Sequence, residues 1–112
     1  MGHKMDRERD AEAWLRREIE KIGGEFWKFT SPGRDGVPDR IALLPVGRVV
    51  FVEMKKSGEH LPPIQRYHIE RLRSMGCEAC VVYGRDGAKR FLRDFSLAQV
   101  VESEYGREVM KP

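Results

Sequence analysis

Four consecutive apolar residues, Val49 to Val52, limit what this chain can fold into. The run has the length of a strand and is far short of the about 20 residues that span a bilayer. Because it lacks polar alternation, it is typical of a central strand that is covered on both faces. A second apolar strand over 39–45 precedes it, with a tight turn at Val46-Gly47 between the two. The pattern predicts a β-hairpin inside a layered fold.

Periodic apolar positions predict the elements around this hairpin. Apolar side chains repeat at helical spacing from Ala11 to Ile22, and Gly23-Gly24 is a strong helix stop. We expect a helix over 6–22, a strand over 25–29, a loop over 30–38, strands over 39–45 and 48–55, a helix over 63–75, a strand over 77–83, a turn over 84–87 and short helices beyond. The order αβββαβ predicts the α/β fold class, with a mixed central sheet flanked by helices.

The length of 112 residues predicts a single domain, residues 1–112, with a core over about 6–84 and a C-terminal helical extension over 85–112. The N-terminus carries no apolar secretory segment, which favours a cytoplasmic location without a membrane partner. Thiols stay reduced in that compartment. We therefore expect Cys77 and Cys80 to be ordinary buried thiols rather than a zinc or redox pair.

The charge of the chain leans mildly towards polyanionic partners such as nucleic acids. It carries 21 Lys and Arg against 18 Asp and Glu, for a formal net charge of +3. The excess of bases lies between residues 25 and 76, because the segments on either side carry equal numbers of bases and acids. The middle of the chain is therefore where its chemistry is expected.

Two acids and a lysine in that middle segment fall where the hairpin would bring them together. Glu53 and Lys55 end the second hairpin strand, and residues two apart on a strand leave the same face. Asp39 begins the first strand, so folding about Gly47 places it opposite the stretch 53–56. Two carboxylates this close repel each other unless one takes up a proton or a cation binds between them.

This patch is a candidate metal site. Carboxylate oxygens suit a hard divalent ion, Mg²⁺ or Mn²⁺, which the backbone carbonyl of Met54 could also bind. A metal there would lower the pKa of a bound water and polarise a phosphoryl oxygen, while Lys55 could orient the water or stabilise charge on the phosphate. The alternative is that Asp39 is a turn acid and that Glu53 and Lys55 form a surface salt bridge.

The same residues resemble a known nuclease signature. Pro38-Asp39 followed by Glu53-Met54-Lys55 is similar to the PD-(D/E)xK motif. The longer strings over 31–40 and 61–65, with a later Gly76, resemble the VRR-Nuc branch, the virus-type replication and repair nuclease domain. The resemblance covers about residues 8–84 and points to the small stand-alone phage and bacterial members. It implies a restriction-endonuclease-like fold and a bacterial or phage-infected cell as the setting.

The resemblance also implies roles for individual residues. Five would be catalytic, and the three acids among them would bind the metal: Asp39, Glu53, Lys55, Gln65 and Glu12. Gln65 matches the family's Gln on the second helix. Glu12 fits the family's helical Glu by its offset from Gly23, with Glu8 as the alternative. A surface acid near a helix N-terminus is the plain interpretation of Glu12.

Several side chains near the proposed site could contact phosphate: Lys28, Ser31, Arg34, Arg40 and Arg66. A solvated surface position is the alternative for Lys28, Ser31 and Arg66. Trp14, Trp27 and Tyr67 could stack on bases, but we expect them to pack in the core.

Together these features predict a metal-dependent DNA endonuclease that hydrolyses phosphodiester bonds. The resemblance implies selectivity for branched DNA such as Holliday junctions, a role in DNA repair, and action as a homodimer. One alternative is a non-catalytic nucleic-acid-binding module on the same fold. Another is a nuclease directed at flaps or linear duplexes.

Overall fold

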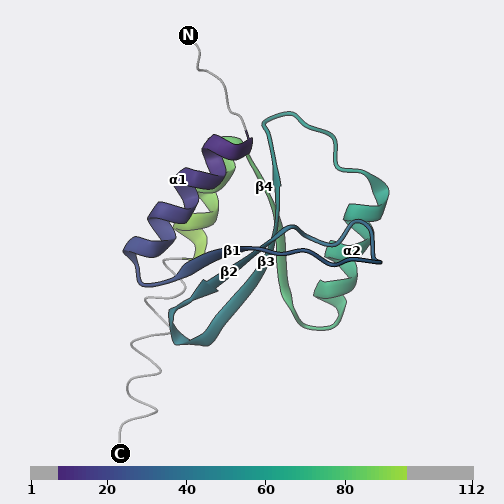
Figure 1. The fold of residues 1–112 in the computed structure, drawn as a ribbon, viewed down its shortest axis with the longest axis horizontal. Helices are drawn as coiled ribbons and strands as arrows, with labels where there is room; N and C mark the ends of the chain where they lie inside the picture. Colours follow the sequence, from purple (N-terminus) through teal and green to yellow (C-terminus); the bar gives the residue numbers. More distant parts are fainter. Residues whose placement is uncertain (1–7, 96–112) are drawn as a thin grey trace, which may run out of the picture.

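We analysed a computed structural model that describes residues 8–95. A mixed four-stranded sheet with helices on both faces forms the body of the protein (Figure 1). In chain order its elements are α1 (Glu8–Lys21), β1 (Glu25–Lys28), β2 (Arg40–Leu44), a 3₁₀ turn (Pro45–Gly47), β3 (Arg48–Lys55), α2 (Pro63–Ser74) and β4 (Glu78–Tyr83). A further helix covers residues 84–95. The predicted αβββαβ order and the α/β class are confirmed.

The strand order follows the chain. The sheet runs β1-β2-β3-β4, with antiparallel pairing from β1 to β3 and parallel pairing of β3 with β4. The β2–β3 hairpin turns at Val46 and Gly47, which both have positive φ (69° and 76°). A parallel pair needs a crossover, and α2 provides it. α1 and the helix over 84–95 lie on one face of the sheet and α2 on the other (Figure 1). None of the described helices is long and apolar enough to cross a membrane.

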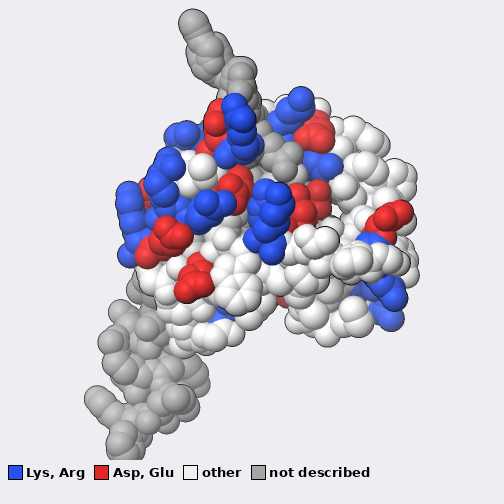
Figure 2. All heavy atoms as spheres, in the orientation of Figure 1, with Lys and Arg blue, Asp and Glu red and all other residues white. Residues whose placement is uncertain are grey.

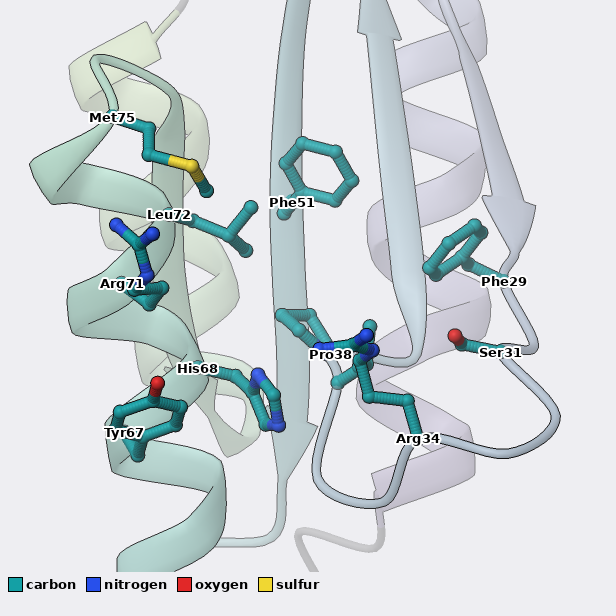
Figure 3. A pocket seen from close by; sticks show the side chains of 11 residues that line it. Phe29, Ser31, Arg34, Pro38, Phe51, Tyr67, His68, Arg71, Leu72 and Met75 are labelled. Carbon is teal, nitrogen blue, oxygen red and sulfur yellow. The ribbon is translucent and has the colours of Figure 1, made fainter.

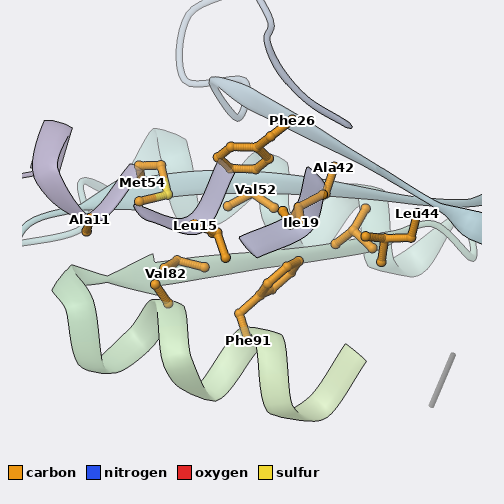
Figure 4. Close-up of a cluster of buried hydrophobic side chains, with 12 residues drawn as sticks. Ala11, Leu15, Ile19, Phe26, Ala42, Leu44, Val52, Met54, Val82 and Phe91 are labelled. Carbon is orange, nitrogen blue, oxygen red and sulfur yellow. The ribbon is translucent and has the colours of Figure 1, made fainter. Parts of the chain in front are cut away.

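The main core lies between the sheet and the two helices on the α1 face (Figure 4). Leu15 and Ile19 of α1 are 0% exposed, as are Val50 and Val52 of β3. Burying an aliphatic side chain of this size stabilises the fold by about 1.5–3 kcal/mol. Phe91 brings the helix over 84–95 into the same cluster. Val50, Val52 and Met54 on this side of β3 are therefore covered.

The other face of the sheet is covered only in part. α2 fully buries a single side chain of its own, Ile69, and Val49 of β3 remains 44% exposed. The expectation that the apolar run of β3 is covered on both faces is therefore wrong at its first residue. Trp27 and Tyr67, which we expected in the core, are 52% and 57% exposed. Trp14 does pack against the core, as expected.

The turn expected over 84–87 is wrong, because a helix begins directly after β4. Gly84, Gly87 and Ala88 are buried at this junction. A Cβ added at Gly87 would lie 3.3 Å from the backbone carbonyl carbon of Val82. Gly87 and Ala88 therefore let the helix approach β4 closely, which is a packing role, whereas Gly84 has a positive φ of 60° that favours glycine. The rest of the expected C-terminal extension, residues 96–112, lies outside the described residues.

Both cysteines are free thiols that are half-buried, so the expectation that they are buried holds only in part. Cys77 precedes β4, and Cys80 lies in β4 and packs against the core cluster. Burial raises the pKa of the Cys80 thiol to about 12.

Candidate active site

Asp39 lies at the end of the loop between β1 and β2. The side chain of Pro38 before it is fully buried, and the Asp39 carbonyl accepts a hydrogen bond from the Phe29 N–H at 2.9 Å. The register of β2 with β3, continued by one residue, places Asp39 opposite Glu53. The Met54 N–H donates a hydrogen bond to Asp39 Oδ1 at 3.2 Å. The predicted approach of Asp39 to the end of β3 is therefore confirmed.

Glu53 and Lys55 are buried at the end of β3. They are 4% and 6% exposed, and strand alternation directs both towards the α2 face, opposite to Val52 and Met54. Lys55 Nζ lies 3.8 Å from Glu53 Oε2. The alternative of a surface salt bridge is wrong, because this pair of charges is removed from water.

A second carboxylate shares the Lys55 ammonium. Glu59 Oε2 lies 3.5 Å from Lys55 Nζ. The pKa of Glu59 is held below its ordinary value, chiefly because the Lys56 backbone N–H donates to its carboxylate at 3.0 Å, and also because Lys55 is close. The Glu59 side chain is 33% exposed, so it forms the solvent-exposed side of this cluster.

Gln65 presents an unsatisfied acceptor in the first turn of α2. Its side-chain Oε1 is buried and has no hydrogen-bond donor among the described residues. Buried polar atoms nearly always have a partner, so a bound water or ion would be stabilised there. The preceding residue, Ile64, lies against the loop that carries Asp39, since a Cβ added at Gly36 would come within 2.8 Å of it. The start of α2 and the loop before β2 therefore meet beside the end of the sheet.

Ion pairs link α1 to Asp39. Glu12 is only 7% exposed, so its predicted inward orientation is confirmed and the plain interpretation as a surface acid is wrong. Glu12 Oε2 lies 3.4 Å from Arg40 Nε and also pairs with Arg16. Arg40 Nη1 in turn lies 3.3 Å from Asp39 Oδ2. Glu8, the alternative, begins α1, but its side chain lies outside the described residues.

The groups at this end of the sheet fit a hard divalent ion. Their donors are oxygens: the carboxylates of Asp39 and Glu53, the carbonyl of Met54 and the open Oε1 of Gln65. Within residues 8–95, no group of three or more His, Cys, Asp or Glu side chains is arranged to hold a metal. Two carboxylates are enough for Mg²⁺, which usually keeps several waters and takes further oxygens from phosphate groups. The donor set therefore suits a metal that is shared with a phosphate substrate.

The predicted phosphate contacts separate into two groups. Lys28, Arg34 and Arg66 are exposed and Ser31 is half-buried. Arg40 differs, because its side chain is 11% exposed and is held by two carboxylates. Figure 2 shows basic side chains concentrated over the α1 side of the molecule, where acids are interleaved with them. That face therefore presents mixed charge and not a uniform positive surface.

A groove on the α2 face was not predicted from the sequence (Figure 3). It encloses about 470 Å³. We call it the aromatic groove and define it by six of its lining residues: Phe29, Arg34, Phe51, Tyr67, His68 and Arg71. The one available sequence signal was that Phe51 shares a strand face with Glu53. That alternation shows which side chains share a face, but not whether anything covers the face.

Known proteins share both the sequence and the fold. The VRR-NUC domain model matches residues 4–86. A protein of Acyrthosiphon pisum secondary endosymbiont phage 1, named "Putative nuclease p44", is 43% identical over 83 residues, which cover 74% of this chain and 89% of the phage protein. A solved structure named "VRR_NUC domain" has a TM-score of 0.70 at 30% identity and covers 77% of this chain and 94% of its own. Another, named "VRR_NUC domain protein", has a TM-score of 0.62 at 20% identity over 78% and 85% of the two chains, and shows the fold alone.

The family match includes the whole of the site described above. Asp39, Glu53, Lys55, Gln65 and Glu12 all fall inside residues 4–86. The expected family is therefore confirmed by sequence, and the mixed sheet flanked by helices matches that of the solved relatives. The chain belongs to the VRR-NUC family of nucleases.

Proposed function

We propose that this protein is a divalent-metal-dependent endonuclease that hydrolyses phosphodiester bonds in DNA. One observation carries the proposal. Asp39, directly before β2, lies opposite Glu53 of β3 at one end of the sheet, and Glu53 lies beside the buried ammonium of Lys55. A buried cluster of charges is costly unless it is paired or functional. Together with the family membership, this cluster supports our proposal that the catalytic centre lies here.

Asp39, Glu53 and the Met54 carbonyl would hold Mg²⁺ or Mn²⁺. The ion would activate a water and polarise the scissile phosphate. The Lys55 side-chain nitrogen lies beside Glu53, where it can stabilise charge that develops on the phosphate oxygens. Gln65 contributes an acceptor that can orient the attacking water, because its Oε1 is buried and open.

Glu12 completes the set as a candidate fourth oxygen ligand. In the described structure its carboxylate pairs with Arg40, which also pairs with Asp39. Arg40 is thus the cation that currently neutralises two of the proposed ligands. A phosphate arriving together with a metal would offer the guanidinium a new partner and leave both carboxylates to the ion. The proposed phosphate contact of Arg40 and the proposed ligand role of Glu12 are therefore coupled.

The substrate we propose is branched DNA such as a Holliday junction, processed during repair in a bacterial or phage-infected cell. The proposal rests on the resemblance to stand-alone VRR-Nuc proteins, and it includes a homodimer. A net charge of +3 is small for a DNA-binding protein, and a two-fold dimer would double the phosphate contacts. Lys28, Ser31, Arg34 and Arg66 are the proposed backbone contacts.

A cleavage panel tests this function. Four-way junctions, flaps and linear duplexes are incubated with the full chain in Mg²⁺, Mn²⁺ or chelator. We expect junction cleavage only with metal, and a loss of at least about 100-fold in Glu53→Gln. Glu59→Gln is the matched control and should keep its cleavage activity, because Glu59 also pairs with Lys55 but lies on the solvent-exposed side of the cluster. Preferential cleavage of flaps or duplexes would replace the junction assignment. Binding without cleavage in any metal would identify a non-catalytic module.

A further inference from the structure

The aromatic groove lies directly beside the proposed catalytic centre. Three separate elements each contribute to both. Pro38, which lines the groove, precedes Asp39, and Phe51 lies two residues before Glu53 on the same face of β3. His68, which also lines the groove, lies three residues after Gln65 on α2, and helix side chains three apart are neighbours. A ligand bound at the centre would therefore extend naturally into the groove.

The walls of the groove are suited to a flat aromatic ligand. The rings of Phe29 and Phe51 pack edge to face, with centroids 6.1 Å apart at 70°. Across from them, Tyr67 and His68 on α2 form a second ring pair with centroids 5.1 Å apart. Figure 3 shows the four rings on opposite sides of the same hollow. The volume of about 470 Å³ falls in the usual range for small-ligand sites.

The charges of the groove are suited to an anion. Arg34 enters from the loop before β2 and Arg71 from α2, and Figure 3 shows both side chains at the groove. Among the described residues that line it, none is Asp or Glu. Aromatic faces combined with cationic groups are the arrangement that binds single-stranded nucleic acid, because bases stack while phosphates meet the positive charges.

We propose that the aromatic groove takes an unpaired base of the DNA strand that is being cut, with adjoining phosphates at Arg34 and Arg71. This inference rests on the proposed function and deepens it. In a duplex the base faces are already stacked, whereas a branch point leaves bases that are cheap to unstack. The groove thereby gives the enzyme a physical means of choosing branched over continuous DNA. Tyr67, at 57% exposure, is the most accessible stacking surface.

Binding in chelator tests the groove without any need for cleavage. The full chain is titrated with a short oligothymidine strand and with an abasic strand of the same length and backbone. The bases should tighten Kd by about 5- to 150-fold, the usual range for one stacked base. Tyr67→Ala should remove that difference and leave the affinity for the abasic strand unchanged. Arg71→Ala should weaken both strands and lower the slope of affinity against salt by about one.

Val46→Ala is the matched control. Val46 is an apolar residue of similar exposure (55%) that lines a different hollow, near Gly47 and Gly76. It should change neither titration. Equal affinity for the two strands, or an equal loss for both in Tyr67→Ala, would overturn the proposal. If Tyr67→Ala changes the sedimentation mass and not the base preference, the groove is a subunit contact and the proposal also fails.

A cleavage experiment locates the stacked base relative to the bond that is cut. Once the cut is mapped, neighbouring nucleotides are made abasic one at a time. At one position kcat/KM should fall about 5- to 150-fold in the native protein, and Tyr67→Ala should show no such loss. Uniform cleavage of all these substrates would contradict the groove assignment while leaving the nuclease intact. Absence of cleavage in every metal would instead contradict the proposed function, and the binding arm would still report on the groove.

Discussion

Replacing Lys55 by Met removes the buried ammonium beside the proposed metal ligands and keeps an unbranched side chain of similar reach. In the native protein Lys55 is 6% exposed and lies 3.8 Å from the carboxylate of Glu53, which is itself 4% exposed. After the substitution, Glu53 remains buried without that positive charge. The variant therefore separates the contribution of Lys55 to folding from its contribution to catalysis.

The expected loss of stability follows from the burial. Removing one partner of a buried ion pair costs about 3–5 kcal/mol. We expect about 3 kcal/mol, the lower end, because a separation of 3.8 Å is longer than a hydrogen bond. For a chain of this size that corresponds to a fall of about 12 °C in Tm. Catalysis should fall separately, by at least about 100-fold at saturating metal.

Urea denaturation in chelator and then in Mn²⁺ measures the effect. In chelator, the free energy of unfolding of Lys55→Met should be lower than the native value by the full amount of about 3 kcal/mol. In Mn²⁺ the ion should supply positive charge near Glu53, and an ion concentration of 100 Kd restores about 2.7 kcal/mol by mass action. Glu59→Gln serves as the control and should lose under about 1 kcal/mol, because Glu59 is partly solvated. A Lys55→Met variant with native stability in chelator, or with native cleavage, would refute this reasoning.

Three further variants or measurements probe other parts of the account. Asp39→Asn keeps an oxygen for the Met54 N–H, so the free energy of unfolding in urea should stay within about 1 kcal/mol of the native value. Cleavage should fall at least about 100-fold, because the carboxylate charge is lost. A large loss of stability would make Asp39 structural. Gly36→Ala should lower Tm more than Gly33→Ala, since both have positive φ but only a Cβ at Gly36 would meet α2, at 2.8 Å; equal melting temperatures would show that the loop does not depend on this contact. The raised pKa of Cys80, about 12 against an ordinary 9.0, predicts that its contribution to stability is complete below pH 9 and is lost as the pH rises towards 12; denaturation of Cys80→Ala across that range should show a weaker pH dependence, and an unchanged one would contradict the assignment.

The sequence was most informative where local pattern and tertiary structure agree. Leu15 and Ile19 repeat at helical spacing and both are fully buried. The Gly23-Gly24 pair ends α1 as expected, with Gly23 at a φ of 91°. The turn position placed Asp39 opposite the stretch 53–56, and the structure narrows that to Glu53. Each of these features depends on residues close together in the chain.

The sequence pattern could not predict how completely the helices cover each face of the sheet. Alternation along β3 shows that Val49 and Phe51 share a face, but α2 covers that face incompletely and leaves Val49 exposed. The aromatic groove arises for this reason, from a loop, a strand and a helix that are distant in the chain. Gly87 was misread for a related reason, because a glycine needed for close helix–strand packing looks locally like a turn residue. The pairing of Arg40 with Glu12 likewise joins elements whose relative placement only the folded chain reveals.

Direct measurement of Mn²⁺ binding tests the central claim, that Asp39 and Glu53 together hold a divalent ion. The full chain is titrated with Mn²⁺ and the free ion is followed by its paramagnetic resonance signal, for the native protein, Glu53→Gln and the control Glu59→Gln. We predict that the native protein and Glu59→Gln bind an ion tightly at the site and that Glu53→Gln loses this binding. Equal Mn²⁺ affinity in all three proteins would contradict the account.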